Sequence, residues 1–413
     1  MLALFCGLPG LLTDASADGL KALDERRYDA AVESFTAAIE ADPKDYASHF
    51  NLAFSLGMLH RDADAIVEYR KALDLKPDLY EAQLNLGIVL IREKQPADAA
   101  VLLDKAASKK PKEFRPVYYL GEALLAAGNL DASQKAFQTA TELDPKSAFA
   151  ELGLARALAR QNKLDDAAPH FRKAADLDPA RRDTLLELAS NYEAAGKPDE
   201  AVALYSQFPD DPAAQEHAGQ LLLQAARADE AIHHFQAAVA QSPTAANRAG
   251  LIQAYLKTHH PELALPLIDQ QLAATPDEYD LVMLKGGILR DQRKLDLAAA
   301  QFLQATKLKP DDWRPWSELA SVLVVADNYL PGLAALDHVR ALNAEKPGHM
   351  FLRAIVLDKM QEMQHSGKAH REAAQGALES YQRFLDASGG KDPNDEFKAR
   401  QRIRIIKQEL NGR

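Results

Sequence analysis

The 413-residue sequence contains a single cysteine, Cys6, so no disulfide can form within one chain. The same scarcity excludes a metal site built from several thiolates. Basic residues are also in the minority, because 49 Lys and Arg stand against 60 Asp and Glu, a formal net charge of −11. A general nucleic-acid binder needs a basic surface that neutralises phosphates, so the composition argues against this function class.

Catalytic motifs are absent as well: the chain has no G-x-S-x-G, P-loop, H-E-x-x-H or C-x-x-C sequence. The candidates for chemistry are two histidine pairs, His233-His234 and His259-His260. Adjacent residues on a helix point about 100° apart, so each pair offers at most one metal ligand in any direction. We therefore interpret them as exposed polar side chains and expect no metal and no cofactor. A metal-dependent enzyme that uses these four histidines remains the alternative from another function class.

Long apolar runs are missing except at the N-terminus, where residues 1–12 read MLALFCGLPGLL. Ala15-Ser16-Ala17 fits a signal-peptide cleavage site, but no Lys or Arg precedes the apolar run. Two interpretations of residues 1–17 stay open: a signal peptide or its remnant, or an apolar segment that caps the first repeat. The location is correspondingly open between periplasmic or secreted and cytoplasmic. No other stretch is long and apolar enough to span a membrane.

What the sequence does contain is a repeated pattern, seen most clearly in residues 46–79. Apolar or small residues recur there at helical spacing in two groups, and a proline closes the unit: Leu52, Ala53 and Leu56, then Ala65, Tyr69 and Ala72, then Pro77. The small side chains let two helices approach closely, and the large ones fill the space between them. Proline cannot continue a helix, so it marks the end of the second one.

The same pattern returns in the stretch that follows, and then again in the next. It reads Leu86, Gly87, Leu90, Ala99, Leu103, Ala106 and Pro111, and next Leu120, Gly121, Leu124, Ser133, Phe137, Ala140 and Pro145. A fixed period of about 34 residues is typical of a helix–turn–helix solenoid. On these residues the chain resembles the tetratricopeptide repeat family over nearly its whole length. The resemblance implies an all-α, right-handed superhelix of about eleven antiparallel helix pairs.

The pattern divides the chain into a solenoid and short end segments. After residues 1–17 we expect repeats through residues 18–385, a loop at 386–396 and a capping helix at 397–413. The repeats begin near residues 12, 46, 80, 114, 148, 182, 212, 245, 279, 313 and 347. A capping helix with one polar side would cover the last apolar face of the solenoid.

Prolines and irregular repeats refine this prediction. Pro96, Pro198 and Pro261 fall in the first turn of predicted second helices, where a missing N–H costs nothing. Pro169 and Pro266 fall inside such helices and predict distortion there. The motif at 208–212, FPDDP, predicts a second helix about one turn short and a local change in stacking angle. The eleventh repeat carries an insertion within 361–375.

The family resemblance also implies where a ligand would bind, because the first helix of each repeat lines a concave groove in this family. The predicted groove positions are Phe50, Asn51, Phe54, Leu84, Asn85, Ile88, Arg92, Tyr118, Tyr119, Glu122, Phe149, Arg156 and Arg160. Aromatic side chains beside arginine are typical binding anchors. Asn can hydrogen-bond an extended backbone, and Arg can pair with a carboxylate. The other interpretation is that some of these residues, Leu84 above all, pack between neighbouring helices.

The resemblance therefore predicts a non-enzymatic scaffold that binds a peptide or protein segment in the concave groove. Its alternative within the binding class is a cell-envelope or secretion assembly factor. Some family members hold a partner's C-terminal carboxylate with lysines beside Asn, but Phe50 and Leu84 stand at those lysine positions here. We expect a protein or peptide partner, no nucleic acid, and a monomer or weak homo-oligomer. Trp313 and Trp316 mark the region where self-association would occur.

Overall fold

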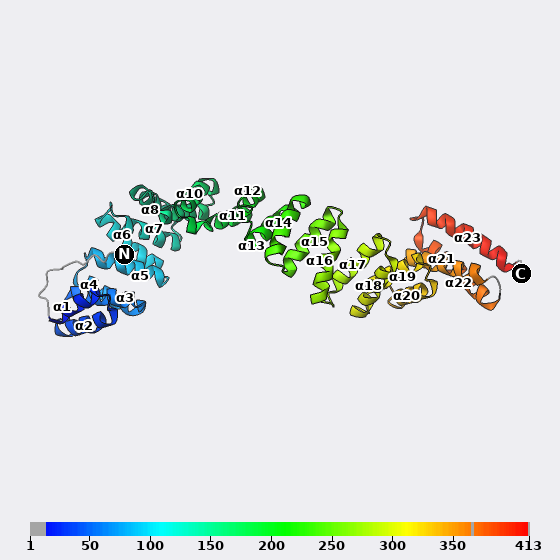
Figure 1. The fold of residues 1–413 in the computed structure, drawn as a ribbon, viewed down its shortest axis with the longest axis horizontal. Helices are drawn as coiled ribbons and strands as arrows, with labels where there is room; N and C mark the ends of the chain where they lie inside the picture. Colours follow the sequence, from blue (N-terminus) through cyan, green and yellow to red (C-terminus); the bar gives the residue numbers. More distant parts are fainter. Residues whose placement is uncertain (1–13, 365–366, 412–413) are drawn as a thin grey trace. The chain divides into compact units, whose positions relative to one another are not determined.

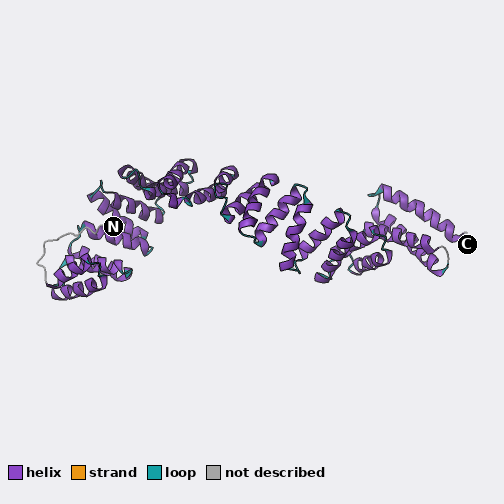
Figure 2. Cartoon of the chain, in the orientation of Figure 1, coloured by secondary structure: helices purple, strands orange, loops and turns teal. Residues whose placement is uncertain are grey.

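The computed structural model describes residues 14–364 and 367–411, and within them it contains helices, turns and loops but no strand (Figure 2). Twenty-three α-helices and one short 3-10 helix follow one another in these described residues. Consecutive helices pack as eleven pairs, and α23 follows the last pair. The predicted all-α solenoid of helix pairs is therefore confirmed.

The chain divides into two compact units at residues 208 and 209. The first unit contains α1 (Asp14–Asp24), α2 (Tyr28–Ala41), α3 (Tyr46–Met58), α4 (Asp62–Leu75), α5 (Tyr80–Arg92), α6 (Pro96–Lys109), α7 (Phe114–Ala126), α8 (Leu130–Leu143), α9 (Ala148–Arg160), α10 (Leu164–Leu177), the 3-10 helix η1 (Pro179–Arg181), α11 (Thr184–Ala194) and α12 (Pro198–Tyr205) (Figure 1).

The second unit contains α13 (Pro212–Gln224), α14 (Ala228–Gln241), α15 (Ala245–Lys257), α16 (Pro261–Ala274), α17 (Tyr279–Asp291), α18 (Leu295–Leu308), α19 (Trp313–Val325), α20 (Tyr329–Ala341), α21 (Pro347–Gln364), α22 (Lys368–Ser388) and α23 (Pro393–Asn411). Among the described residues, no helix is long and apolar enough to cross a membrane.

Local sequence signals explain where these helices begin. Pro96, Pro198 and Pro261 each occupy the first position of a second helix, as predicted. Asp45 caps α3, because its carboxylate accepts hydrogen bonds from the backbone N–H groups of Ala47 and Ser48. The predicted distortion at interior prolines does not interrupt a helix, since α10 and α16 both continue past theirs.

The core runs between the helices and repeats with them. Each second helix of the first five pairs buries one large side chain completely or almost completely, at equivalent positions of successive repeats: Phe35, Tyr69, Leu103, Phe137 and Phe171. The small residues Ala53, Ala65 and Ala72 are fully buried around Tyr69. The prediction that large side chains fill the space between helices that small residues bring close together is therefore confirmed.

Irregular repeats change helix length. The helix α12 has only 8 residues, whereas α10 and α14 have 14 each, so the predicted shortening before residue 208 is confirmed. The insertion in the eleventh repeat lengthens both of its helices, to 18 residues in α21 and 21 in α22. The added residues therefore extend the packed surface of this repeat and do not form one long loop.

The predicted boundaries near the two ends need correction. The predicted loop at 386–396 is too long, because α22 continues to Ser388 and α23 already begins at Pro393. The Glu396 carboxylate accepts hydrogen bonds from the Ser388 hydroxyl and the Gly390 N–H, which closes this short turn. At the other end α1 begins at Asp14, inside the predicted segment 1–17, and residues 1–13 with Cys6 lie outside the described residues.

Candidate functional site

The first helices of successive pairs form one continuous row in the first unit. The helix α3 contacts α5, α5 contacts α7, and α7 contacts α9 (Figure 1). Among the described helices, no two successive second helices make a comparable contact. The helices that lie closer together define the inner side of a curved stack, so α3, α5, α7 and α9 line its concave side.

Each of these helices has a strip of positions that faces away from the core. They follow the spacing i, i+4, i+7 and i+11, which places them within about 60° of one direction around the helix. The positions immediately to either side, such as Phe50 and Ser55 on α3, are buried, and so is Gly153 within the strip of α9. We call the accessible strip the inner face: Ala47, Asn51, Phe54 and Met58 on α3; Glu81, Asn85, Ile88 and Arg92 on α5; Arg115, Tyr119, Glu122 and Ala126 on α7; Phe149, Arg156 and Arg160 on α9.

The prediction that Phe50 and Leu84 face the groove is wrong. Phe50 is 8% exposed and Leu84 is 6% exposed, so both lie between packed helices. The Phe50 ring packs against the Tyr69 ring, with the ring centres 5.8 Å apart. Leu152, at the equivalent position of α9, is also buried, at 4% exposure. An apolar residue at this repeat position serves the contact between first helices, which is the packing interpretation of Leu84.

Tyr118 occupies that same position on α7 and is intermediate between core and surface. Its ring meets the buried Phe137 ring edge-on at 5.8 Å between centres and stacks with Phe114 at 5.5 Å. On its other sides it contacts Tyr119 at 5.2 Å and Phe149 at 6.4 Å. Four of these residues, Phe114, Tyr118, Tyr119 and Phe149, form an aromatic cluster that connects the core to the inner face.

Phe149 is the most open member of the aromatic cluster, with 52% of its surface exposed. The guanidinium of Arg181, from η1, lies 3.9 Å from the centre of the Phe149 ring. Such a distance is typical of a cation–π contact. No sequence signal pointed to Arg181, because it belongs to the irregular turn that precedes α11.

Charged groups of α7, α9 and α11 lie beside the aromatic cluster. Arg156 donates from Nε and Nη2 to the Glu187 carboxylate at 2.8–3.0 Å, and this pairing raises the pKa of the guanidinium. Burial raises the pKa of the half-buried Glu122, and the positive charge of nearby Arg156 partly opposes this effect.

The remaining predicted polar residues differ in whether they already form hydrogen bonds or ion pairs within the chain. Arg92 donates to Asp62 at 2.6 Å, and Arg160 donates to the Leu125 carbonyl at 3.0 Å. The Asn85 side chain lies near the buried Tyr69 hydroxyl. Asn51, Phe54 and Ile88 are half-buried on the inner face.

Two charged inner-face residues escaped the sequence prediction, although a usable signal existed. Glu81 and Arg115 precede Phe149 by whole repeat periods and share its position on the first helix. Arg115 lies one repeat before Phe149 and Glu81 lies two repeats before it, so a comparison of equivalent positions would have identified both.

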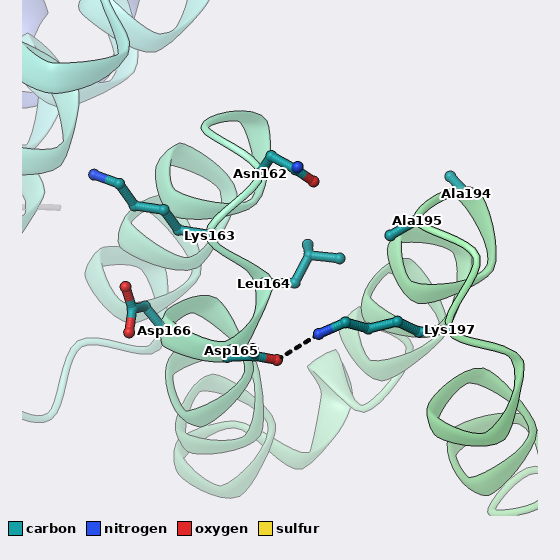
Figure 3. Close-up of a pocket in the computed structure, with 8 residues that line it drawn as sticks. All are labelled: Asn162, Lys163, Leu164, Asp165, Asp166, Ala194, Ala195 and Lys197. Atoms are coloured by element: carbon teal, nitrogen blue, oxygen red, sulfur yellow. Dashed lines mark hydrogen bonds and ion pairs between the residues drawn. The ribbon is translucent and has the colours of Figure 1, made fainter.

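A separate hollow of about 530 Å³ lies at one edge of the first unit, between the turn that joins α9 to α10 and the turn that joins α11 to α12. Its walls include Lys163, Asp165, Asp166 and Lys197, and Lys197 Nζ donates to Asp165 Oδ1 at 2.8 Å (Figure 3). No inner-face residue lines this hollow. It is an open, polar space whose charged groups already pair across it in part.

The histidine pairs do not assemble a metal site in the part of the chain that the structure describes. His234 hydrogen-bonds Gln215 at 2.8 Å, and His260 lies 3.2 Å from the Glu262 carboxylate. His233 is exposed, and His259 occupies a turn with positive φ. Within residues 14–364 and 367–411, no three histidine, cysteine or carboxylate side chains come together as metal ligands.

Comparison with known structures finds helical repeat proteins of low identity. MamA from Desulfovibrio magneticus RS-1 is 23% identical over 40% of this chain and 94% of its own, with a TM-score of 0.39. YrrB, described as a TPR protein with an unusual peptide-binding site, is 24% identical over 47% of this chain and 98% of its own (TM-score 0.39). A tetratricopeptide repeat protein from Parabacteroides merdae ATCC 43184 is 18% identical over 58% and 97% (TM-score 0.42).

No curated protein matches the sequence. Family models, however, match it repeatedly. One tetratricopeptide repeat model matches residues 17–78, 61–114, 118–181 and 250–312, and a second matches residues 158–223. The matches of the first model alone cover more than half of the sequence, and the chain belongs to the tetratricopeptide repeat family.

Proposed function

We propose that this chain is a non-enzymatic scaffold that holds a peptide or protein segment along the inner face of α3, α5, α7 and α9. The tetratricopeptide repeat fold is typically an interaction scaffold of this kind. The observation that carries the proposal is the set of large side chains that stay partly accessible on the inner face. Phe149 is half-exposed there, and Phe54 and Ile88 pack against the core on one side but are only half-buried.

The chemistry of the inner face suits an extended segment. The half-buried Phe54 and Ile88 offer apolar surface on α3 and α5, and the aromatic cluster continues it on α7 and α9. Asn51 can both donate and accept hydrogen bonds, as an extended backbone requires. Affinity would come from a few such anchors, since buried area alone does not determine it.

A comparative pull-down from native lysate tests this proposal. The bait variant combines Phe149→Ser with Arg160→Glu, because both side chains are exposed and neither change opens the core. The matched control combines Val101→Ser with Arg172→Glu, which makes the same kinds of chemical change on exposed positions of the second helices α6 and α10. Circular dichroism establishes that both variants keep their helices.

We expect a protein that wild type and the control retain and the inner-face variant loses at least in large part. Truncating a binding anchor typically weakens binding by about 2 kcal/mol, or roughly thirtyfold. Equal retention by all three baits would contradict the proposal, because the partner would then bind elsewhere on the chain.

A further inference from the structure

Glu122 is the inner-face carboxylate that lies one helical turn after Tyr118 of the aromatic cluster. It belongs to α7 and is half-buried. Within the described residues, no Lys, Arg or His nitrogen forms an ion pair with it at 4.0 Å or less. A carboxylate that is partly removed from water needs such a partner to offset the cost of its burial.

The nearest cation does not fill this role. Arg156 is close enough to favour the charged form of Glu122, but its Nε and Nη2 both point to the Glu187 carboxylate. Glu122 therefore keeps no cation of its own at ion-pair distance. An incoming cation would supply this partner, whereas an incoming anion would be repelled by the carboxylate.

The walls of the site favour a cation for a second, independent reason. Aromatic rings attract cations to their faces, and Glu122 shares the inner face with two members of the aromatic cluster, Tyr119 on the same helix and Phe149 on α9. Phe149 already accommodates one guanidinium, that of Arg181, at 3.9 Å from the ring centre. With that contact in place, Phe149 still exposes 52% of its surface.

We propose that Glu122, Tyr119 and Phe149 form a subsite for the cationic side chain of a lysine or arginine carried by the bound segment. The inference rests on the proposed function and adds its partner chemistry: the segment bears a basic residue at the point where it crosses from α7 to α9. The carboxylate would supply charge-assisted hydrogen bonds, and the ring of Phe149 would cover the aliphatic stem of the basic side chain.

Peptide selection on the full chain tests the subsite while the natural partner is still unidentified. A phage library of random dodecapeptides would be selected on immobilised wild type, on Glu122→Gln and on Glu142→Gln. Glu122→Gln keeps the size of the side chain and removes its charge. Glu142→Gln is the matched control, because Glu142 is an exposed carboxylate on the second helix α8.

We expect selected peptides to share a Lys or Arg at one fixed position on wild type and on Glu142→Gln, and to lose that preference on Glu122→Gln. For one selected peptide, Glu122→Gln should weaken binding about tenfold, as expected for the loss of a charge-assisted contact. Phe149→Leu, which keeps an apolar side chain but removes the ring, should weaken the same peptide about threefold.

Selected peptides without a basic position would overturn the cation subsite and leave the scaffold function standing. A basic preference that persists on Glu122→Gln would also overturn it, since the cation would then bind elsewhere. If wild type retained no peptide at all, the scaffold function would fail and the subsite with it. These results differ from one another, so each proposal can fail separately.

Discussion

At the scale of single residues, the fold depends on how large side chains of the second helices meet glycines of the first helices. Phe137 on α8 is fully buried between Gly121 on α7 and Gly153 on α9. A Cβ atom on Gly121 would lie 2.9 Å from the Phe137 ring, and one on Gly153 would lie 2.3 Å from it. Glycine therefore sets the distance at which α9 packs on the preceding pair.

Gly153→Ala should destabilise the first unit. The added methyl group would overlap the buried ring, which has no free space to move into, and overpacking of this kind costs about 2 kcal/mol. The midpoint of urea denaturation, followed by circular dichroism, would fall.

Gly287→Ala is the matched control, because a Cβ on this glycine of α17 would meet no atom within 4 Å. Removing the backbone freedom of a helical glycine should stabilise the protein by about 0.5–1 kcal/mol. Equal effects of the two substitutions would show that the contact with Phe137 does not matter.

The burial of single side chains also explains why the prediction of the binding residues was only partly correct. Position 50 and its equivalents at 84 and 152 are apolar, and an apolar residue suits both a groove and a helix contact. Burial depends on how closely α3, α5 and α9 stack, and the sequence does not specify this distance. Asn51, Phe54, Asn85, Ile88 and Arg92 follow the helical period and do reach the inner face.

At the scale of elements, each helix pair turns through one residue with positive φ. In the first unit this residue recurs once in each repeat, at Arg26, His60, Lys94, Gly128, Asn162 and Gly196. In the second unit it includes Ala226, with φ of 60°. Residues with a Cβ atom adopt this left-handed conformation at a cost, and glycine adopts it freely. Most turns of this chain therefore hold a residue that is not optimal for its backbone.

Ala226→Gly should stabilise the second unit by about 0.5–1 kcal/mol, because relief of the left-handed strain outweighs the added freedom of the unfolded chain. A rise in the thermal midpoint would report it. Ala225→Gly serves as the comparison, since Ala225 has a φ of −78° that alanine adopts without strain. A gain in stability from both substitutions would contradict the explanation.

The last three helices are joined by a buried ion pair. Asp358 on α21 accepts hydrogen bonds from Arg402 on α23 at 2.5 and 2.6 Å and from the Tyr381 hydroxyl on α22 at 3.1 Å. The Asp358 side chain is only 6% exposed. Loss of the Asp358 charge would leave Arg402 only its more exposed contact with Glu362, at 2.9 Å.

Asp358→Asn should therefore weaken the attachment of α23 by about 2–3 kcal/mol. Hydrogen exchange measured by mass spectrometry would show faster exchange of the amides in 393–411. Asp395→Asn breaks only an exposed pair with Lys398 and should change exchange little, by under about 0.5 kcal/mol. Unchanged exchange in Asp358→Asn would mean that apolar contacts alone hold the helix.

Element boundaries were predictable where a local signal fixed them. Pro96, Pro198 and Pro261 begin their helices because proline tolerates the first position and little else within a helix. The end of α22 was not predictable in this way. Its turn is closed by Glu396 reaching back to Ser388 and Gly390, a contact that composition does not reveal.

At the scale of the whole molecule, the repeat period predicts the fold almost completely and the partner not at all. Every repeat of the first five pairs reuses the same buried position, such as those of Phe35, Tyr69 and Phe137, so a single pattern specifies these helix pairs. The inner-face positions differ from repeat to repeat, for example Ile88 and Glu122 at one shared position. Packing constrains these half-buried or exposed positions less than the buried ones, so their variation leaves the fold unchanged.

The most direct test places a photoreactive residue on the inner face. Replacing Phe149 with p-benzoylphenylalanine keeps an aromatic ring on α9, and the same replacement of Val101 on α6 provides an equally exposed control, at 52% and 58% exposure respectively. After irradiation in native lysate, we predict a discrete crosslinked product from position 149 and none from position 101. A product from position 101 alone would contradict the assignment of binding to the inner face.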